Sequence, residues 1–299
     1  MSFLLWKNRH VLFCLRGCSN AMDQKLLRLY PAPFEEVSVK GLYLSHRVHE
    51  MGTEHSPFVY ANFLSSLDGR IALEDAEQGT TFIPKHLTTD SDFRLFMELH
   101  AQADCLITHG GYLRALATKK LGNILQVGIR PEQTDLAEWR KKNGLKPQPA
   151  VVIASASLDF PIHESLHEFG QKVYIATGRR ADPERIRFWQ KQGYPVLLTG
   201  GNEWVQGAPL INELSTLGYK SIYLIAGPHM LDTIIREKQL SYLYQTITHQ
   251  LLGGEEFRTL LPGAMLGPEG NLRLESLYYD PDSPAGSGQF FTPFKYRRD

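Results

Sequence analysis

Short apolar runs alternate with amphipathic stretches along most of the chain, between residues 57 and 279. Apolar runs of about four to eight residues, rich in Val, Ile and Leu, are typical of strands buried on both faces. Residues 93–103 and 182–192 instead carry apolar side chains at helical spacing. This alternation predicts an α/β fold with a doubly wound, mostly parallel central sheet and helices on both faces. The expected strands cover 58–64, 104–108, 150–154, 172–176, 195–199, 221–225, 240–251 and 272–279.

The first apolar run, at 58–64, breaks at Ser65, Ser66, Asp68 and Gly69 before apolar residues resume. This pattern predicts a buried strand that delivers polar side chains to a tight turn, where a ligand can bind. An Asp-Gly turn that merely closes a hairpin is the alternative, because that dipeptide is common in hairpins. The pattern alone leaves both interpretations open.

Two later strands also end in turns that contain glycine. His109, Gly110 and Gly111 follow one of them, and Gly227 and Pro228 follow another. A glycine between a strand and a helix lets the backbone approach a phosphate, and the free N–H groups at the helix start face it. Ligands of doubly wound sheets bind beyond the carboxyl ends of the strands. The alternatives are a Gly-Pro turn that only starts a structural helix and a His109 that is a plain turn residue.

Composition narrows the choice of partners. The 299 residues include 32 basic and 32 acidic side chains, so net charge gives no case for nucleic acid or an anionic membrane. Three cysteines, Cys14, Cys18 and Cys105, form no pair or cluster with zinc-like spacing. No apolar run approaches the roughly 20 residues of a membrane helix. We therefore expect no metal, no membrane and no nucleic acid, a cytoplasmic location, and a core position for Cys105.

The chain divides into four segments. Residues 1–21 imitate a signal peptide, but their apolar core of about five residues falls short of the roughly 7 to 15 expected. We interpret them as a leader outside the fold, with Met22 as an alternative start. Residues 22–56 contain two prolines and little periodicity, which predicts an extended arm that wraps the domain. The domain itself covers 57–279, and 280–299 are expected to form a loop-like tail.

Four motifs occur in a fixed order: Ser-Leu-Asp-Gly-Arg-Ile-Ala at 66–72, a helix that runs into Asp104, Ala-Gly-Pro at 226–228, and Leu-Leu-Gly-Gly at 251–254. Together they resemble the RibD C-terminal family, the reductase domain of riboflavin biosynthesis proteins. The resemblance implies a dihydrofolate-reductase-like fold, NADPH as cofactor and a homodimer. It also implies that hydride reduces the ribosyl group of a 5-amino-6-(5-phosphoribosylamino)uracil-like substrate to ribityl.

The resemblance also assigns roles by position. Asp68 and Ser66 would be catalytic, with Asp68 anchoring ribose hydroxyls or relaying a proton. Ser65 and His109 would contact the substrate, as would Arg94, for which surface charge is the alternative. The implied cofactor-binding residues are Gly110, Gly111, Ala226, Gly227, Pro228, His229 and Met230. The deaminase half of the bifunctional family members is absent, because neither its His-x-Glu nor its Pro-Cys-x-x-Cys motif occurs.

Several positions depart from the family pattern. Ile225 stands where a glutamate is expected before the Ala-Gly-Pro turn. Leu116 and Ala117 replace acidic residues after the second glycine turn, and Tyr242 and Leu243 replace Asp-Glu in a late strand. The cofactor half of the resemblance is thus stronger than the substrate half. Two alternatives follow: a diverged, non-catalytic nucleotide-binding protein of the same fold, and a pterin or dihydrofolate-type reductase.

Three further basic residues are candidates for phosphate binding. Arg179 and Arg180 follow a strand directly, and arginine matches phosphate with two parallel hydrogen bonds. They are candidates for the 2′-phosphate of NADPH, and a solvated loop is the alternative. Lys85 is a candidate for the substrate phosphate, with plain surface charge as the alternative.

Overall fold

The computed structural model describes residues 24–75, 80–282 and 286–296, so the predicted leader at 1–21 lies outside the described residues. Within this part of the chain, twelve strands form a central sheet and three form a small second sheet. The strands are β1 (Lys25–Tyr30), β2 (Glu35–Ser38), β3 (Phe58–Ser66), β4 (Arg70–Asp75), β5 (Thr80–Phe82), β6 (Cys105–His109), β7 (Ala150–Ala154), β8 (Val173–Thr177), β9 (Val196–Leu198), β10 (Ser221–Leu224), β11 (Tyr242–Thr248), β12 (Phe257–Thr259), β13 (Leu272–Leu274), β14 (Leu277–Asp280) and β15 (Gln289–Tyr296).

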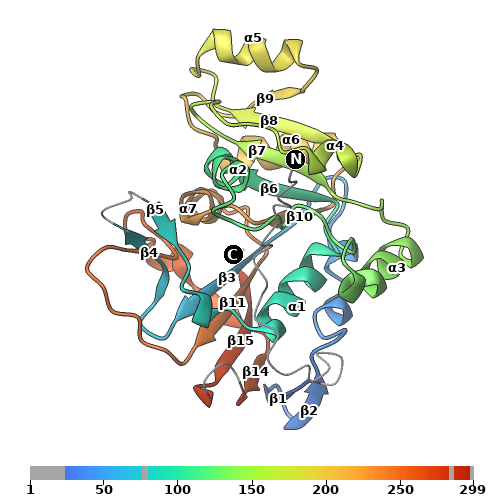
Figure 1. Ribbon diagram of the computed structural model, residues 1–299, viewed down its shortest axis with the longest axis vertical. Coiled ribbons are helices and arrows are strands. Elements are labelled where there is room, and N and C mark those ends of the chain that lie inside the picture. The colour runs from blue at the N-terminus through green and yellow to red at the C-terminus, as the bar shows by residue number, and fades with distance from the viewer. Residues whose placement is uncertain (1–23, 76–79, 283–285, 297–299) are drawn as a thin grey trace, which may run out of the picture.

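The central sheet has the strand order β2-β1-β14-β15-β11-β3-β10-β6-β7-β8-β9 (Figure 1). β13 pairs with β15 beside this path. Every neighbouring pair from β11 to β9 is parallel. Antiparallel pairs extend the sheet beyond β11. The predicted mostly parallel sheet is therefore confirmed, and β3 and β10 occupy its centre. The small sheet has the order β12-β4-β5.

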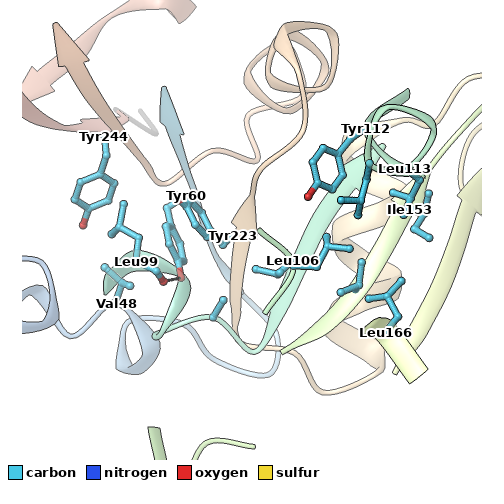
Figure 2. Close-up of a cluster of buried hydrophobic side chains, with 14 of the residues drawn as sticks. Val48, Tyr60, Leu99, Leu106, Tyr112, Leu113, Ile153, Leu166, Tyr223 and Tyr244 are labelled. Carbon is cyan, nitrogen blue, oxygen red and sulfur yellow. Dashed lines mark hydrogen bonds between the residues drawn. The ribbon is translucent and has the colours of Figure 1, made fainter. Parts of the chain in front are cut away.

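Helices cover both faces of the central sheet, as predicted. Leu99 and Leu113 pack with Tyr60 in one core cluster (Figure 2), whereas Leu231 packs with Ala61 in a second. Neighbouring residues of β3 therefore serve opposite faces, as the alternation of a strand requires. The helices are α1 (Asp90–His100), α2 (Gly110–Ala117), α3 (Thr134–Lys142), α4 (Ser165–Glu168), α5 (Pro183–Lys191), α6 (Gly207–Thr216) and α7 (Pro228–Arg236), with short 3-10 turns η1 (Leu44–His46), η2 (Val48–Glu50), η3 (Lys85–Leu87), η4 (Pro131–Gln133) and η5 (Gly267–Gly270).

The N-terminal arm is part of the sheet. β1 pairs antiparallel with both β2 and β14, so the arm lengthens one edge. After β2 the chain is held by Glu98 of α1, a fully buried carboxylate. Glu98 accepts hydrogen bonds from the backbone N–H groups of Gly41 at 2.6 Å and Tyr43 at 2.9 Å. The arm therefore does not simply wrap around the domain, because its backbone is paired within the sheet and tied to α1.

The prediction of a loop-like tail after residue 279 is wrong for its described part. Residues 289–296 form β15, which pairs with β11 over seven positions near the middle of the sheet. Proline is unusual in a central strand, because it lacks the N–H donor of a ladder, and β15 contains Pro293. The Pro293 carbonyl accepts the Glu275 N–H at 2.9 Å, in the gap between β13 and β14. The N–H and C=O groups of one residue in an antiparallel strand point to the same side. The donor that Pro293 lacks would therefore face this gap and not β11, so the ladder with β11 is undisturbed.

Candidate functional site

β6 and β10 lie side by side and parallel, with Leu224 opposite Ile107. From β6 the chain enters α2 on one face and continues to β7, whereas from β10 it enters α7 on the other face and continues to β11. Connections that diverge from neighbouring parallel strands leave a crevice at the carboxyl ends of those strands. The structure thus brings the two predicted glycine turns together. A Cβ on Gly227 would lie 3.9 Å from Nε2 of His109.

His109 ends β6 and caps α2. Its Nδ1 accepts a hydrogen bond from the Tyr112 N–H at 3.3 Å. Because Nδ1 is an acceptor, the proton of a neutral imidazole lies on Nε2, the atom that faces Gly227. Burial, with a smaller contribution from the Arg114 charge, lowers the pKa of His109 to about 4. His109 is therefore neutral at neutral pH, and its Nε2–H can donate a hydrogen bond to a ligand in the crevice.

Packing inside the protein accounts for Gly110 and Gly111. A Cβ on Gly110 would come within 2.9 Å of Phe160 Cδ1 and 3.1 Å of Ser155 Oγ. A Cβ on Gly111 would come within 2.9 Å of His109 Nδ1 and would displace the imidazole that caps α2. Both glycines are required by their protein neighbours, so the structure gives them a structural reason in addition to the predicted place beneath a cofactor.

Gly227 has no such internal reason. Its φ of −72° and ψ of −178° are open to any residue, and within 4 Å a Cβ would meet only the His109 ring. Gly227 is also the N-cap of α7, and no side chain caps this helix start. Pro228 takes the first helical position, Ala226 is buried and His229 is exposed. The start of α7 therefore has no side-chain cap, and it lies next to the Nε2–H of His109.

Asp68 and Ser66 form a closed turn rather than an open site. The Asp68 carboxylate accepts hydrogen bonds from Ser66 Oγ, from Arg70 Nη1 at 2.6 Å and from Gly253 N–H at 2.9 Å. The hydrogen bonds from Ser66 and from the Gly253 N–H are the main reason that the pKa of Asp68 falls to about 2. Asp68 therefore ties the Ser-Leu-Asp-Gly turn to the Leu-Leu-Gly-Gly segment, and a carboxylate this acidic is a poor proton relay.

The register of β3 also separates this turn from the crevice. Ala61 lies opposite Leu224, the last residue of β10, so Ser66 is five residues further along β3. At about 3.3 Å per residue, this places Ser66 about 16 Å beyond the end of β10. On the face that carries Tyr60, the β3 side chains nearest the level of the Gly227 turn are those of Asn62 and Leu64. This register and the closed turn support a structural position for Ser66 and Asp68, whereas their catalytic role stays a prediction.

Two predicted substrate contacts are engaged elsewhere. Ser65 is buried and receives a hydrogen bond from Gln245 Nε2 at 3.1 Å, so its side chain belongs to the sheet. Arg94 donates from Nη1 and Nη2 to both carboxylate oxygens of Asp135, at 3.1 and 2.7 Å. Its Nε donates to Glu98 at 2.9 Å. Each of the three guanidinium nitrogens thus donates to a carboxylate of the protein, which supports a structural role for Arg94.

The remaining candidates divide into exposed and buried ones. Arg179 and Arg180 are exposed at the carboxyl end of β8, and neither makes an ion pair with another described residue. Their backbone N–H groups donate to the carbonyls of Gly200 at 3.2 Å and Asn202 at 3.0 Å, which fixes the loop. Cys105 is fully buried in β6, as predicted.

One buried carboxyl was missed. Asp92, in the first turn of α1, is 8% exposed, and its Oδ1 accepts no hydrogen bond from any described residue. Burial raises its pKa to about 6, although the hydroxyl of Thr246 opposes the shift. In the sequence, an acidic residue at a helix start has an ordinary explanation in the helix dipole. Only the orientation of α1 against the sheet shows that this side chain points inward.

The positions that depart from the family pattern are mostly packed. Leu116 is buried among the residues of the first core cluster, and Leu243 among those of the second. Tyr242 packs against Phe58, with ring centroids 5.2 Å apart and the rings tilted by 46°. Ile225 is only partly buried, so it borders the crevice with an apolar side chain.

Residues 57–281 match the family described as RibD C-terminal domain. This chain belongs to that family. The RibD C-terminal domain here contains all the strands and turns of the crevice, whereas β1, β2 and β15 lie outside the matched residues.

Named relatives of this RibD C-terminal domain are distant in sequence. The 2,5-diamino-6-ribosylamino-4(3H)-pyrimidinone 5′-phosphate reductase of Archaeoglobus fulgidus is 21% identical over 207 residues, covering 69% of this chain and 87% of the relative. A pyrimidine reductase-like protein from Corynebacterium diphtheriae superposes with a TM-score of 0.59 at 19% identity, covering 81% and 93% of the two chains. The riboflavin biosynthesis reductase Rib7 of Saccharomyces cerevisiae gives 0.54 at 13%, covering 86% and 99%. These two structures share the fold.

Within the described part of this chain, no group of three or more His, Cys, Asp or Glu side chains has an arrangement suited to a metal ion. Among its described helices, none is long and apolar enough to cross a membrane.

Proposed function

We propose that this chain is an NADPH-dependent reductase that converts the ribosyl group of a ribosylaminopyrimidine 5′-phosphate into a ribityl group. The observation that carries the proposal is the bare start of α7 beside His109, at the point where the connections from β6 and β10 diverge. Family membership and the activity named for the Archaeoglobus relative support the reaction class.

The starts of α7 and α2 would hold the pyrophosphate of NADPH. Helix N-termini offer free N–H groups and a partial positive charge, which suit a phosphate. Gly227 leaves room for the phosphates, and His109 adds a neutral N–H donor from the opposite side of the crevice. The bound cofactor supplies the hydride. Arg179 and Arg180, two strands away from β6, would pair with the 2′-phosphate and favour NADPH over NADH.

The substrate would lie on an open strip of the sheet. Asn62 and Leu64 on β3, and Ile225 directly after β10, are partly exposed, whereas Tyr60 and Tyr223 on the same face are fully buried. The chain would align the C1 carbon of the ribose there, which gains the hydride while its nitrogen or oxygen gains a proton. We propose that Asp68 acts at a distance, by holding the turn after β3 against residues 252–253.

Titration of the purified protein with NADPH and, separately, with NADH tests the cofactor site. Nicotinamide fluorescence or calorimetry should detect NADPH binding in the micromolar range, and weaker binding of NADH. Absence of binding by either nucleotide would overturn the assignment of the crevice.

A diverged, non-catalytic nucleotide-binding protein is the second candidate. It is favoured by the uncharged side chains of Leu116, Ile225 and Tyr242 at positions that are acidic in the family pattern. This candidate requires NADPH binding without oxidation in the presence of any ribosylaminopyrimidine phosphate. A pterin reductase would instead turn over dihydrofolate alone, so both substrates should be assayed side by side.

The proposal includes a homodimer and a cytoplasmic location. Leu67 and Leu251 are 56% and 74% exposed, and the Leu67 N–H donates to the Gln250 carbonyl, so the two apolar side chains belong to adjoining turns. Such exposed leucines suit a protein contact. Light scattering coupled to size-exclusion chromatography should give twice the monomer mass, and a Leu251→Lys variant should lower it.

A further inference from the structure

Asp92 is the one carboxyl of α1 that the protein buries without satisfying. Its Oδ1 accepts no hydrogen bond within the described residues, and the carboxylate forms no ion pair with any of them. Glu98 on the same helix provides the comparison, because it is equally buried but accepts bonds from Gly41, Tyr43 and Arg94. A buried acceptor without a donor is costly. Glu98 is therefore accounted for by the fold, and Asp92 is not.

The groups that face Asp92 supply no positive charge. Tyr43 precedes η1, Tyr223 lies on β10 and Thr246 lies on β11, and the negative charge of Asp92 contributes to the raised pKa of both tyrosines. These neighbours offer hydroxyl groups only. A carboxylate is an acceptor without donors of its own, so the matching ligand group must carry N–H or N⁺–H bonds.

Asp92 also lies at the edge of the open strip. Thr246, which faces its carboxyl, is opposite Leu64 in the β3–β11 register, and Leu64 and Asn62 are the partly exposed residues of β3. The Gly227 turn borders the strip from β10, which is the other neighbour of β3. A ligand on the strip would thus meet the cofactor turn on one side and the Asp92 carboxyl on the other.

We propose that Asp92 binds the N–H edge of the substrate's pyrimidine ring and makes the enzyme selective for a 2-amino-4-pyrimidinone over a uracil. This inference rests on the proposed reductase function. A 2-amino-pyrimidinone presents N3–H and the 2-amino group as two adjacent donors, which match the two oxygens of one carboxylate. A uracil presents a carbonyl oxygen in place of the 2-amino group. That oxygen would face a carboxylate oxygen, acceptor against acceptor, and a site built for a donor strongly rejects such an analogue.

Steady-state kinetics with the two ribosylaminopyrimidine 5′-phosphates, at about pH 8 where the carboxyl is ionised, tests the inference. The expected kcat/KM for the 2,5-diaminopyrimidinone is at least about a hundredfold above that for the 5-aminouracil. Asp92→Asn should reduce this ratio by about tenfold or more, chiefly by raising KM for the diaminopyrimidinone. Asp90→Asn removes the same charge from the exposed side of the same helix turn and should leave the ratio unchanged. Equal use of both substrates by the wild type, or an unchanged ratio in Asp92→Asn, would overturn the inference.

A binding measurement separates this inference from the proposed function. The free bases 2,5,6-triamino-4-pyrimidinone and 5,6-diaminouracil differ only at ring position 2, and saturation-transfer NMR detects their binding without turnover. Preferential binding of the triamino base, lost in Asp92→Asn and kept in Asp90→Asn, would support the role of Asp92 even if neither substrate oxidised NADPH. Turnover of both substrates combined with equal binding of the two bases would leave the reductase standing and refute the role of Asp92.

Discussion

Replacing Asp92 by Asn should change the pH dependence of stability by an amount that the structure allows us to work out. Burial raises the pKa of this carboxyl from its ordinary value of 3.8 to about 6. The folded state therefore holds the proton more tightly than the unfolded state does. Stability is lost as pH rises through the interval between these two values, and the loss is complete above the folded pKa. Ionisation of Asp92 should cost about 1.6 kcal/mol at pH 5 and about 3 kcal/mol at pH 8.

Urea denaturation of wild type and Asp92→Asn between about pH 5 and pH 8 measures this cost. The Asn side chain has its own hydrogen-bonding requirements, which change the free energy of unfolding by the same amount at every pH. The informative quantity is therefore how the difference in free energy of unfolding between the two proteins changes with pH. Relative to the wild type, Asp92→Asn should gain about 1.4 kcal/mol over this range. Tyr43 and Tyr223, whose pKa values are raised well above the ordinary range, stay neutral and contribute nothing. A difference that does not vary with pH would refute the reasoning.

Three other substitutions test the cofactor crevice and the turn after β3. Gly227→Ala should keep the stability of the wild type but weaken NADPH binding by about tenfold or more. The control Gly122→Ala, where an added Cβ also meets open space, should change neither stability nor affinity. Thermal melting measures the stability and calorimetry the affinity. Asp68→Asn should lower stability at neutral pH, because the lowered pKa of Asp68 marks a stabilising charge that is lost only as pH falls toward about 2. Its NADPH affinity should stay near the wild-type value, and a lost affinity with unchanged stability would contradict the structural role. Replacing Arg179 and Arg180 together by Ala should weaken NADPH but not NADH, and equal weakening of both nucleotides would exclude a 2′-phosphate site.

The parallel half of the fold could be predicted because its strands are buried on both faces. Runs such as 150–154 contain no polar side chain, so they indicate a sheet that helices cover on both sides. The antiparallel extension was harder to predict. β15 contains Pro293, which disturbs no ladder hydrogen bond only because it faces the gap between β13 and β14. The local sequence pattern contains no information about that gap.

The site was predictable as separate turns but not as an arrangement. His109 and Gly227 each stand at a strand-to-helix junction, which the sequence shows, but their contact depends on the insertion of β10 between β3 and β6. Asp68 looked catalytic because its hydrogen-bond donors at Leu252 and Gly253 lie 184 and 185 residues away in the chain. Long-range partners of this kind decide whether a polar side chain is free for a ligand.

Turnover of a ribosylaminopyrimidine 5′-phosphate with NADPH tests the central claim most directly. Loss of nicotinamide absorbance should accompany a product that mass spectrometry identifies by a gain of two hydrogen atoms, and Gly227→Ala should slow the reaction by weakening NADPH binding. The account would be contradicted by a protein that binds NADPH but neither oxidises it nor changes the mass of any ribosylaminopyrimidine phosphate.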